Sequence, residues 1–203
     1  IVMSTPDDAL ERLLEGNKRF VSGSSVHPNR CEETRRNLES AQRPYAVILS
    51  CSDSRVPVEI IFDVGFGEVF VVRTAGHTLS QDVMGSIEYA VQELGVQLVM
   101  ILGHNNCGAV KSAVKTYSDE DSRGAGNVQA ILDHIYPAVK KTCSCCEAGS
   151  KDFIDKAVKE NVRYQVSELI KKDRYIAALL KFNQIKVVGA YYDIAASTIE
   201  LLD

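Results

Sequence analysis

Four continuous apolar runs of strand length, separated by segments of helical periodicity, most constrain how this chain can fold. The runs cover Tyr45–Ser50, Val69–Arg73, Val96–Leu102 and Ile185–Ala190. An apolar run without polar alternation is typical of a strand with both faces covered, as in a parallel sheet. Helices between such strands supply the crossovers that parallel strands require. We therefore expect an α/β fold with a central, mostly parallel four-stranded sheet flanked by helices, with or without a fifth antiparallel strand.

The helical segments are indicated by apolar residues spaced three and four apart and by capping residues. Thr5 and Asp8 form a capping box before the first helix, and Pro6 suits its first position. Further helices are expected at about Thr34–Gln42, Asp82–Leu94, Gly108–Tyr117, Asn127–Lys141, Phe153–Lys171 and Arg174–Phe182. The polar segments Ser118–Asn127 and Thr142–Lys151 are predicted to be surface loops. We expect a single domain, with an N-terminal helical arm (residues 1–42) and an α/β core (residues 43–203).

Charge and hydropathy exclude two classes of partner. The chain has 203 residues, with 23 Lys and Arg against 27 Asp and Glu and a net charge of −4. No positive excess is therefore available to attract a nucleic acid. The longest apolar run is far shorter than the ~20 residues of a membrane-spanning helix, so no membrane partner is expected. Cysteines without a disulfide framework favour the cytoplasm, although the chain starts at Ile1, which leaves export or organelle import after removal of a leader open.

Cysteine and histidine side chains follow two of the predicted strands. Cys51 comes directly after the first strand, and His104 and Cys107 follow the third. Because ligands of open α/β sheets bind beyond the carboxyl ends of the strands, these side chains are expected at one edge. Two thiolates and an imidazole suit Zn²⁺, and three protein ligands leave a fourth position for water, as in catalytic zinc sites. The alternative is that the cysteines are small buried hydrophobic residues and His104 caps a strand end.

An acidic and a basic side chain lie just past Cys51. Asp53 and Arg55 are close enough to pair, and the guanidinium would keep the carboxylate ionised. Beside zinc, such a carboxylate can accept a hydrogen bond from zinc-bound hydroxide and align it for attack. Taken alone, the pair is better explained as an ordinary surface salt bridge, but its position next to Cys51 favours the catalytic role.

Two motifs resemble the signatures of the β-class carbonic anhydrases: Cys51-Ser-Asp-Ser-Arg55 and Gly103-His104-x-x-Cys107-Gly108-Ala109. Weaker matches extend the resemblance over nearly the whole chain, at Arg73-Thr-Ala-Gly76, Ser86-Ile-Glu-Tyr-Ala90, Glu160-Asn161-Val162 and Tyr192-Asp193. The resemblance implies one Zn²⁺ per chain, bound by Cys51, His104 and Cys107. It also implies reversible hydration of CO2 to bicarbonate and a proton, by attack of zinc-bound hydroxide oriented by an Asp53–Arg55 dyad.

The resemblance further implies a substrate pocket and self-association. Gln42 matches a family glutamine that hydrogen-bonds the substrate. The positions that line the family's pocket are occupied by Phe70, Ala75 and Tyr89, and Gly108 offers a backbone N–H beside the metal. From the residues alone, Phe70 and Ala75 are better explained as strand and turn core. Family members form homodimers, or dimers of dimers (homotetramers), through the N-terminal helix and the sheet edge. Parts of each pocket can therefore come from the partner.

The chain departs from the family pattern in several places. Thr74 stands where asparagine is common, and His77 follows Gly76. His77 and Tyr89 are candidate proton shuttles, with a hydrogen-bonded structural His77 favoured over a titrating one. One subgroup has a noncatalytic bicarbonate site built from Trp, Arg and Tyr, but this chain has Ile48 at the Trp position and contains no Trp. Whether Asp53 can swing onto the metal in a closed state is left open.

Rival functions remain open on the sequence. The same site could hydrolyse carbonyl sulfide or carbon disulfide, or the protein could be a noncatalytic zinc or interaction protein. The Asp53–Arg55 pair argues against the latter, because a structural zinc site needs no such pair. The segment Cys143-Ser-Cys145-Cys146 contains a Cys-x-x-Cys spacing. Because it follows a helix and precedes a polar stretch, a surface loop is favoured over a redox or second-metal role.

Overall fold

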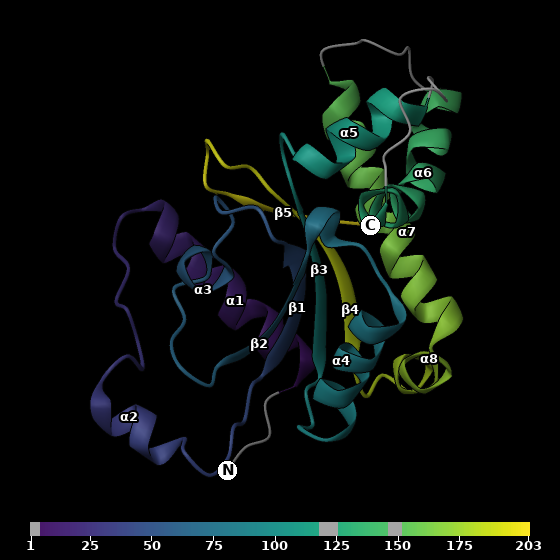
Figure 1. Ribbon diagram of the computed structural model, residues 1–203. Coiled ribbons are helices and arrows are strands. Elements are labelled where there is room, and N and C mark those ends of the chain that lie inside the picture. The colour runs from purple at the N-terminus through teal and green to yellow at the C-terminus, as the bar shows by residue number, and fades with distance from the viewer. Residues whose placement is uncertain (1–4, 118–125, 146–151) are drawn as a thin grey trace.

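The computed structural model describes residues 5–117, 126–145 and 152–203, and a five-stranded sheet forms its centre (Figure 1). The strands are β1 (Ala46–Cys51), β2 (Val69–Thr74), β3 (Leu98–His104), β4 (Lys186–Tyr192) and β5 (Ile199–Leu202). Their order is β2-β1-β3-β4-β5. The first four strands are parallel, and β5 runs antiparallel to β4. The predicted α/β fold is confirmed, and the fifth antiparallel strand, which the sequence left open, is present.

Helices cover both faces of the sheet. They are α1 (Pro6–Val21), α2 (Glu32–Asn37), α3 (Val58–Ile61), the 3-10 turn η1 (Ala75–His77), α4 (Gln81–Gln92), α5 (Gly108–Tyr117), α6 (Asn127–Cys145), α7 (Phe153–Lys172) and α8 (Arg174–Lys181). Helices α1 and α3 cover one face, and α4, α7 and α8 cover the other. Helices α5 and α6 pack on α7 beside the carboxyl ends of the strands. None of the helices described here combines the length and apolar character needed to cross a membrane.

The two central strands explain the uninterrupted apolar runs. Every residue of β1 and β3 is buried. In β1, Ile48 packs into the cluster under α1, whereas Val47 and Leu49 pack into the cluster under α4. Successive side chains of a strand point to opposite faces, so both faces must be apolar when both are covered.

Strand β2 departs from this prediction because it lies at the edge of the sheet. It pairs with β1 alone, and its apolar residues Val69 to Val72 are only half-buried. The continuous apolar run therefore does not mean that this chain covers both faces of β2. The described part of the chain leaves a partly exposed apolar edge.

The N-terminal segment divides into a packed helix and a projecting one. The Thr5–Asp8 capping box forms as predicted, and Leu13 of α1 is fully buried in the core. At Gly16, a Cβ atom would lie 1.9 Å from the carbonyl oxygen of Phe62, so only glycine permits this approach to α3. Helix α2 buries none of its residues and projects from the body of the molecule. Only part of the predicted arm thus extends away from the core.

Several boundaries differ from those predicted. Helix α6 continues to Cys145, so Thr142–Cys145 is helical and is not the predicted loop. The rest of that predicted loop lies outside the described residues, as does most of the predicted loop Ser118–Asn127. Helix α2 begins at Glu32 and ends at Asn37, earlier than expected. The four-residue α3 and the three-residue η1 were not predicted, because such short elements carry no periodicity.

A buried carboxylate joins the N-terminal segment to the turn after α3. Asp63, in the turn after α3, is 1% exposed and accepts a hydrogen bond from Arg19 Nε at 2.7 Å. It also accepts backbone N–H bonds from Val26 at 3.0 Å and His27 at 2.9 Å. Burial raises the pKa of Asp63, but the three hydrogen bonds outweigh burial and leave the pKa below its ordinary value. The carboxylate therefore remains charged while joining α1, the following loop and α3.

Replacing this carboxylate is expected to destabilise the protein. Asp63→Asn removes the charge that Arg19 faces, and loss of one partner of a buried ion pair costs about 3–5 kcal/mol. Urea unfolding at neutral pH measures this loss. The difference from the wild type should shrink as the pH falls below about 4, because a lowered folded-state pKa contributes stability only above the unfolded value.

The matched control is Glu32→Gln, which removes the exposed ion pair with Arg36 on α2. An exposed pair contributes only about 0–1 kcal/mol. Equal losses in the two variants would contradict the structural role assigned to Asp63.

Candidate metal centre

Three potential metal ligands meet at the carboxyl edge of the sheet. Cys51 ends β1, His104 ends the neighbouring β3, and Cys107 directly precedes α5. Their ligand atoms all lie within 4.8 Å of one another, and all three residues are buried. The two sulfur atoms are 4.0 Å apart. The convergence predicted from the sequence is therefore present, and it results from the adjacency of β1 and β3.

The imidazole of His104 is oriented for metal binding. Its Nδ1 lies 2.8 Å from the carbonyl oxygen of Asn105, which assigns the proton to Nδ1. Its Nε2 is buried and has no hydrogen-bond partner among the described residues. A metal-binding histidine commonly donates its other N–H to a carbonyl or carboxylate in this way. The unpartnered nitrogen therefore presents a lone pair toward the two thiols.

The two thiols are electrostatically coupled. A hydrogen bond from Cys107 lowers the pKa of Cys51, whereas the same contact together with burial raises the pKa of Cys107. Two thiolates this close repel each other, so both ionise only when a cation lies between them. Two thiolates and one imidazole nitrogen form a donor set that suits Zn²⁺. The residues therefore fit a zinc ion.

Asp53 is fixed beside the three ligands by Arg55. The carboxylate accepts from the Arg55 backbone N–H and Nε at 2.9 Å each and from a terminal guanidinium nitrogen at 2.7 Å. These contacts hold the pKa of Asp53 well below its ordinary value. Its Oδ2 lies 3.8 Å from His104 Nε2. The predicted pair is thus formed, and it places an ionised acceptor next to the metal ligands.

Arg73 supports the ligand loop, a role that sequence reasoning missed. Its Nε donates to the Cys51 carbonyl at 3.0 Å, and a terminal nitrogen donates to the Asp53 carbonyl at 2.7 Å. A terminal guanidinium nitrogen of Arg55 donates a hydrogen bond to the Asn106 carbonyl at 3.3 Å. Asn106 has a φ of 54°, in the left-handed region that asparagine tolerates better than most residues. The asparagine directly before Cys107 was the sequence signal that could have predicted this turn.

The predicted substrate-binding residues fall into two groups. Ala75 lies in η1, directly after the β2 residue that pairs with Cys51, and Gly108 follows Cys107. Gln42, Phe70 and Tyr89 instead lie near the amino end of the sheet. In register Phe70 pairs with Val47, four residues before Cys51, which corresponds to about 13 Å along the strand. One chain therefore does not bring these three residues to its own metal centre.

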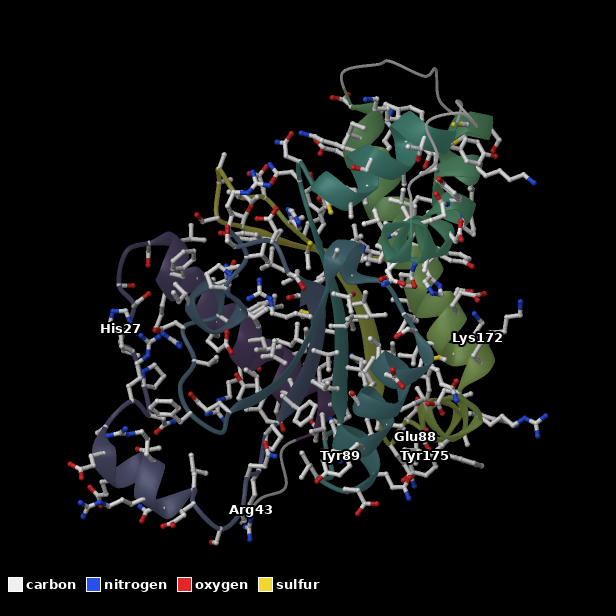
Figure 2. All side chains as sticks on the ribbon, in the orientation of Figure 1. His27, Arg43, Glu88, Tyr89, Lys172 and Tyr175 are labelled. Atoms are coloured by element: carbon white, nitrogen blue, oxygen red, sulfur yellow. The ribbon has the colours of Figure 1, made fainter. Side chains whose placement is uncertain are left out.

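The positions of Gln42 and Tyr89 agree with this division. Gln42 shares a surface cavity of about 390 Å³ with Tyr45 and Gly95, which flank the amino ends of the central strands. The Tyr89 ring lies 6.2 Å from that of Phe70 and is exposed. Figure 2 shows Tyr89 and Arg43 at the end of the molecule opposite α5 and α6. Arg43 directly follows Gln42 in the sequence.

Within one chain, the two candidate proton shuttles are poorly placed for that role. His77 is fully buried, and its Nε2 lies 2.9 Å from the Asn161 side-chain nitrogen. Burial lowers the pKa of His77 to about 4, so the ring is neutral at physiological pH. A shuttle needs access to solvent and a pKa near the working pH. The structural interpretation of His77 is therefore favoured, and Tyr89 lies at the far end of the sheet.

The cysteine-rich segment does not form a second metal site in the described residues. Cys143 and Cys145 lie exposed on the last turn of α6, and Cys146 lies outside the described residues. Within residues 5–117, 126–145 and 152–203, Cys51, His104 and Cys107 form the one group of this kind that could hold a metal ion.

Comparison with known proteins gives a consistent result. The family model described as carbonic anhydrase matches residues 46–199. A carbonic anhydrase of Mycolicibacterium smegmatis is 39% identical over 98% of this chain and 94% of its own length. Carbonic anhydrase 2 of Mycobacterium tuberculosis is 38% identical over 94% of this chain and 90% of its own length. A solved β-carbonic anhydrase from Coccomyxa aligns with a TM-score of 0.72 and 26% identity, over 95% of this chain and 86% of that one.

The metal centre leads to a direct test of metal content. We expect the purified chain to contain one zinc ion, and we expect Cys107→Ala to lose it because a ligand and its negative charge are removed. Elemental analysis after gel filtration measures both. Cys143→Ala is the matched control, since Cys143 is an exposed free cysteine on α6 and should leave the zinc content unchanged. Full zinc content in Cys107→Ala would rule out this ligand set.

Proposed function

The chain belongs to the β-class carbonic anhydrase family and is a carbonic anhydrase, and we propose that Cys51, His104 and Cys107 hold the zinc ion at which it hydrates CO2. The reaction is the reversible conversion of CO2 and water into bicarbonate and a proton. When bound, zinc lowers the pKa of a coordinated water to about 7 and so supplies a nucleophile at neutral pH. The remaining contributions come from the side chains of this chain.

Asp53 orients the attacking group. Arg55 keeps the carboxylate ionised, so Asp53 can only accept a hydrogen bond, never donate one. A nucleophile that donates its single O–H to Asp53 turns a lone pair away from the carboxylate and toward CO2. Arg73 and Arg55 hold the loop in place before substrate arrives, so little reorganisation is needed during the reaction.

The observation that carries the proposal is the placement of an Arg-bound carboxylate beside an open three-ligand set. A structural zinc site closes its fourth position with a protein ligand. Here Asp53, the acidic group nearest His104 Nε2, is bound to Arg55 by three hydrogen bonds. This arrangement favours a catalytic site over a noncatalytic zinc protein.

Activity measurements test the proposal. Stopped-flow CO2 hydration should show fast, zinc-dependent turnover that rises with pH, because the nucleophile that zinc would supply is a deprotonated water. We expect Asp53→Asn to retain zinc and to lower kcat/KM about 100-fold or more, as when an orienting group is lost. Asp133→Asn, an exposed change on α6, is the control. Zinc-loaded wild type without turnover would overturn the hydratase assignment.

We further propose that the active enzyme is a homodimer in which each chain completes the other's pocket. Strand β2 leaves an apolar edge half-exposed, and its Phe70 ring lies 6.2 Å from the ring of Tyr89, tilted by 40°. In a twofold pairing across this edge, the amino end of one sheet lies beside the carboxyl end of the other. The partner's Gln42, Phe70 and Tyr89 would then approach the metal centre that they cannot reach in their own chain.

Mixed dimers test this arrangement. Asp53→Asn and the double variant Phe70→Ala/Tyr89→Ala should each be nearly inactive as homodimers. A mixed dimer has one site with a normal Asp53 and a normal partner surface, so mixing should restore a substantial fraction of wild-type activity. If Phe70 and Tyr89 act within their own chain, every site in a mixture carries a defect, and no activity returns.

A further inference from the structure

Three buried polar side chains lie behind the metal centre and take no part in the chemistry described above. His77 and Asn161 are fully buried, and Gln165 is 1% exposed. His77 belongs to η1, whereas Asn161 and Gln165 lie one turn apart on α7. Buried polar groups are costly unless they are hydrogen-bonded, so their arrangement calls for an explanation.

Asn161 is the centre of this group. Its side-chain nitrogen donates to the carbonyl of Gly76 at 3.0 Å and to His77 Nε2 at 2.9 Å. Its side-chain oxygen accepts from Gln165 Nε2 at 3.1 Å. Gln165 is itself fixed, because its oxygen accepts from the Leu79 amide at 3.0 Å and its nitrogen donates to the His134 carbonyl at 3.0 Å. The carboxamide of Asn161 is therefore held in one orientation.

The backbone that Asn161 holds is in an unusual conformation. Gly76 has a φ of 71° and His77 a φ of 45°, so two consecutive residues lie in the left-handed region. Such a conformation costs free energy for a non-glycine residue and persists only where the surroundings enforce it. A Cβ at position 76 would also lie 2.8 Å from Ile135 Cδ1. Asn161 contacts both left-handed residues, the carbonyl of the first and the ring of the second.

This turn directs an amide at a metal ligand. The Gly76 N–H donates to Cys51 Sγ at 3.4 Å, and the Asp53 N–H donates to the same sulfur at 3.4 Å. The Asp53 amide belongs to the ligand loop itself. The Gly76 amide comes from a different segment and depends on the conformation of η1. Amide donors stabilise negative charge on sulfur and fix the direction of its lone pairs.

We propose that Asn161 is a positioning residue for the metal site, which holds the Gly76 amide on the Cys51 sulfur by binding the Gly76 carbonyl and His77. This inference rests on the proposed binding of a metal ion by Cys51. Helix α7 thereby supports a ligand at the end of β1 through η1. Groups that orient a metal ligand typically change metal affinity about 10- to 100-fold when they are removed.

The direct test is NMR of the ¹¹³Cd-loaded, ¹⁵N-labelled protein. Cadmium replaces zinc in thiolate sites, and a hydrogen bond from an amide to a metal-bound sulfur produces a coupling between the amide proton and the metal. We expect couplings from both the Gly76 and the Asp53 amide protons. A coupling from Asp53 without one from Gly76 would overturn the inference and leave the metal site intact. A chain that binds no cadmium would overturn the metal site and the inference together.

A variant tests the role of Asn161 itself. In Asn161→Leu, which keeps a similar volume, the Gly76 coupling should disappear while the Asp53 coupling remains. The zinc dissociation constant, measured by competition with a chelator, should rise about 10-fold or more. Circular dichroism checks that the variant is folded. If folded Asn161→Leu retains the Gly76 coupling and the zinc affinity, Asn161 is merely structural.

The matched control is Thr142→Val. Thr142 is also a buried polar residue on a neighbouring helix, and its hydroxyl donates only to the Ala138 carbonyl, at 2.9 Å. This variant should keep both couplings and the zinc affinity. If Asn161→Leu does not fold, the wild-type couplings still decide whether the Gly76 amide binds the sulfur.

Discussion

The pairing of β1 with β3 is the constraint on which the rest of the site depends. Both strands are buried on both faces, and their parallel register brings their carboxyl ends to one edge. Cys51 and His104 end these two strands, and Cys107 follows at the start of α5. Because the strands cannot shift without exposing their apolar faces, the spacing of the ligands is set by the core. Packing in the sheet thus fixes the relative positions of the three candidate metal ligands.

Charge is balanced around this edge by side chains from several elements. The Asp53 carboxylate and two ionisable thiols lie at this edge, and Arg55 and Arg73 bring positive charge to it. Arg73 acts mainly through the backbone, since it binds carbonyls at both ends of the Cys51–Asp53 segment. The contacts of Arg73 therefore serve the ligand loop.

The two edges of the sheet differ in a way that bears on the assembly. At one edge β5 runs antiparallel to β4, and at the other β2 leaves half-buried apolar side chains next to Tyr89. The residues that the family resemblance assigns to substrate binding are split between the two ends of the sheet. Their separation along β1 and β2 is a consequence of strand register, and a second chain is the simplest means of joining them. The proposed dimer therefore follows from the same parallel pairing that builds the metal site.

The sequence by itself determined the fold class, the positions of β1 to β4 to within two residues and the candidate ligands that meet at the sheet edge. Each depends on local information, namely uninterrupted apolar runs, a capping box at Thr5, and thiol and imidazole groups at strand ends. Only the tertiary structure decided the roles of Arg73 and Asn161, the burial of His77 and the remoteness of Phe70 from Cys51. Asn161 meets the Gly76 carbonyl across a sequence separation of 85 residues, and no local pattern encodes such a contact. Local periodicity specifies which elements form, whereas strand order and packing between distant residues determine which side chains meet.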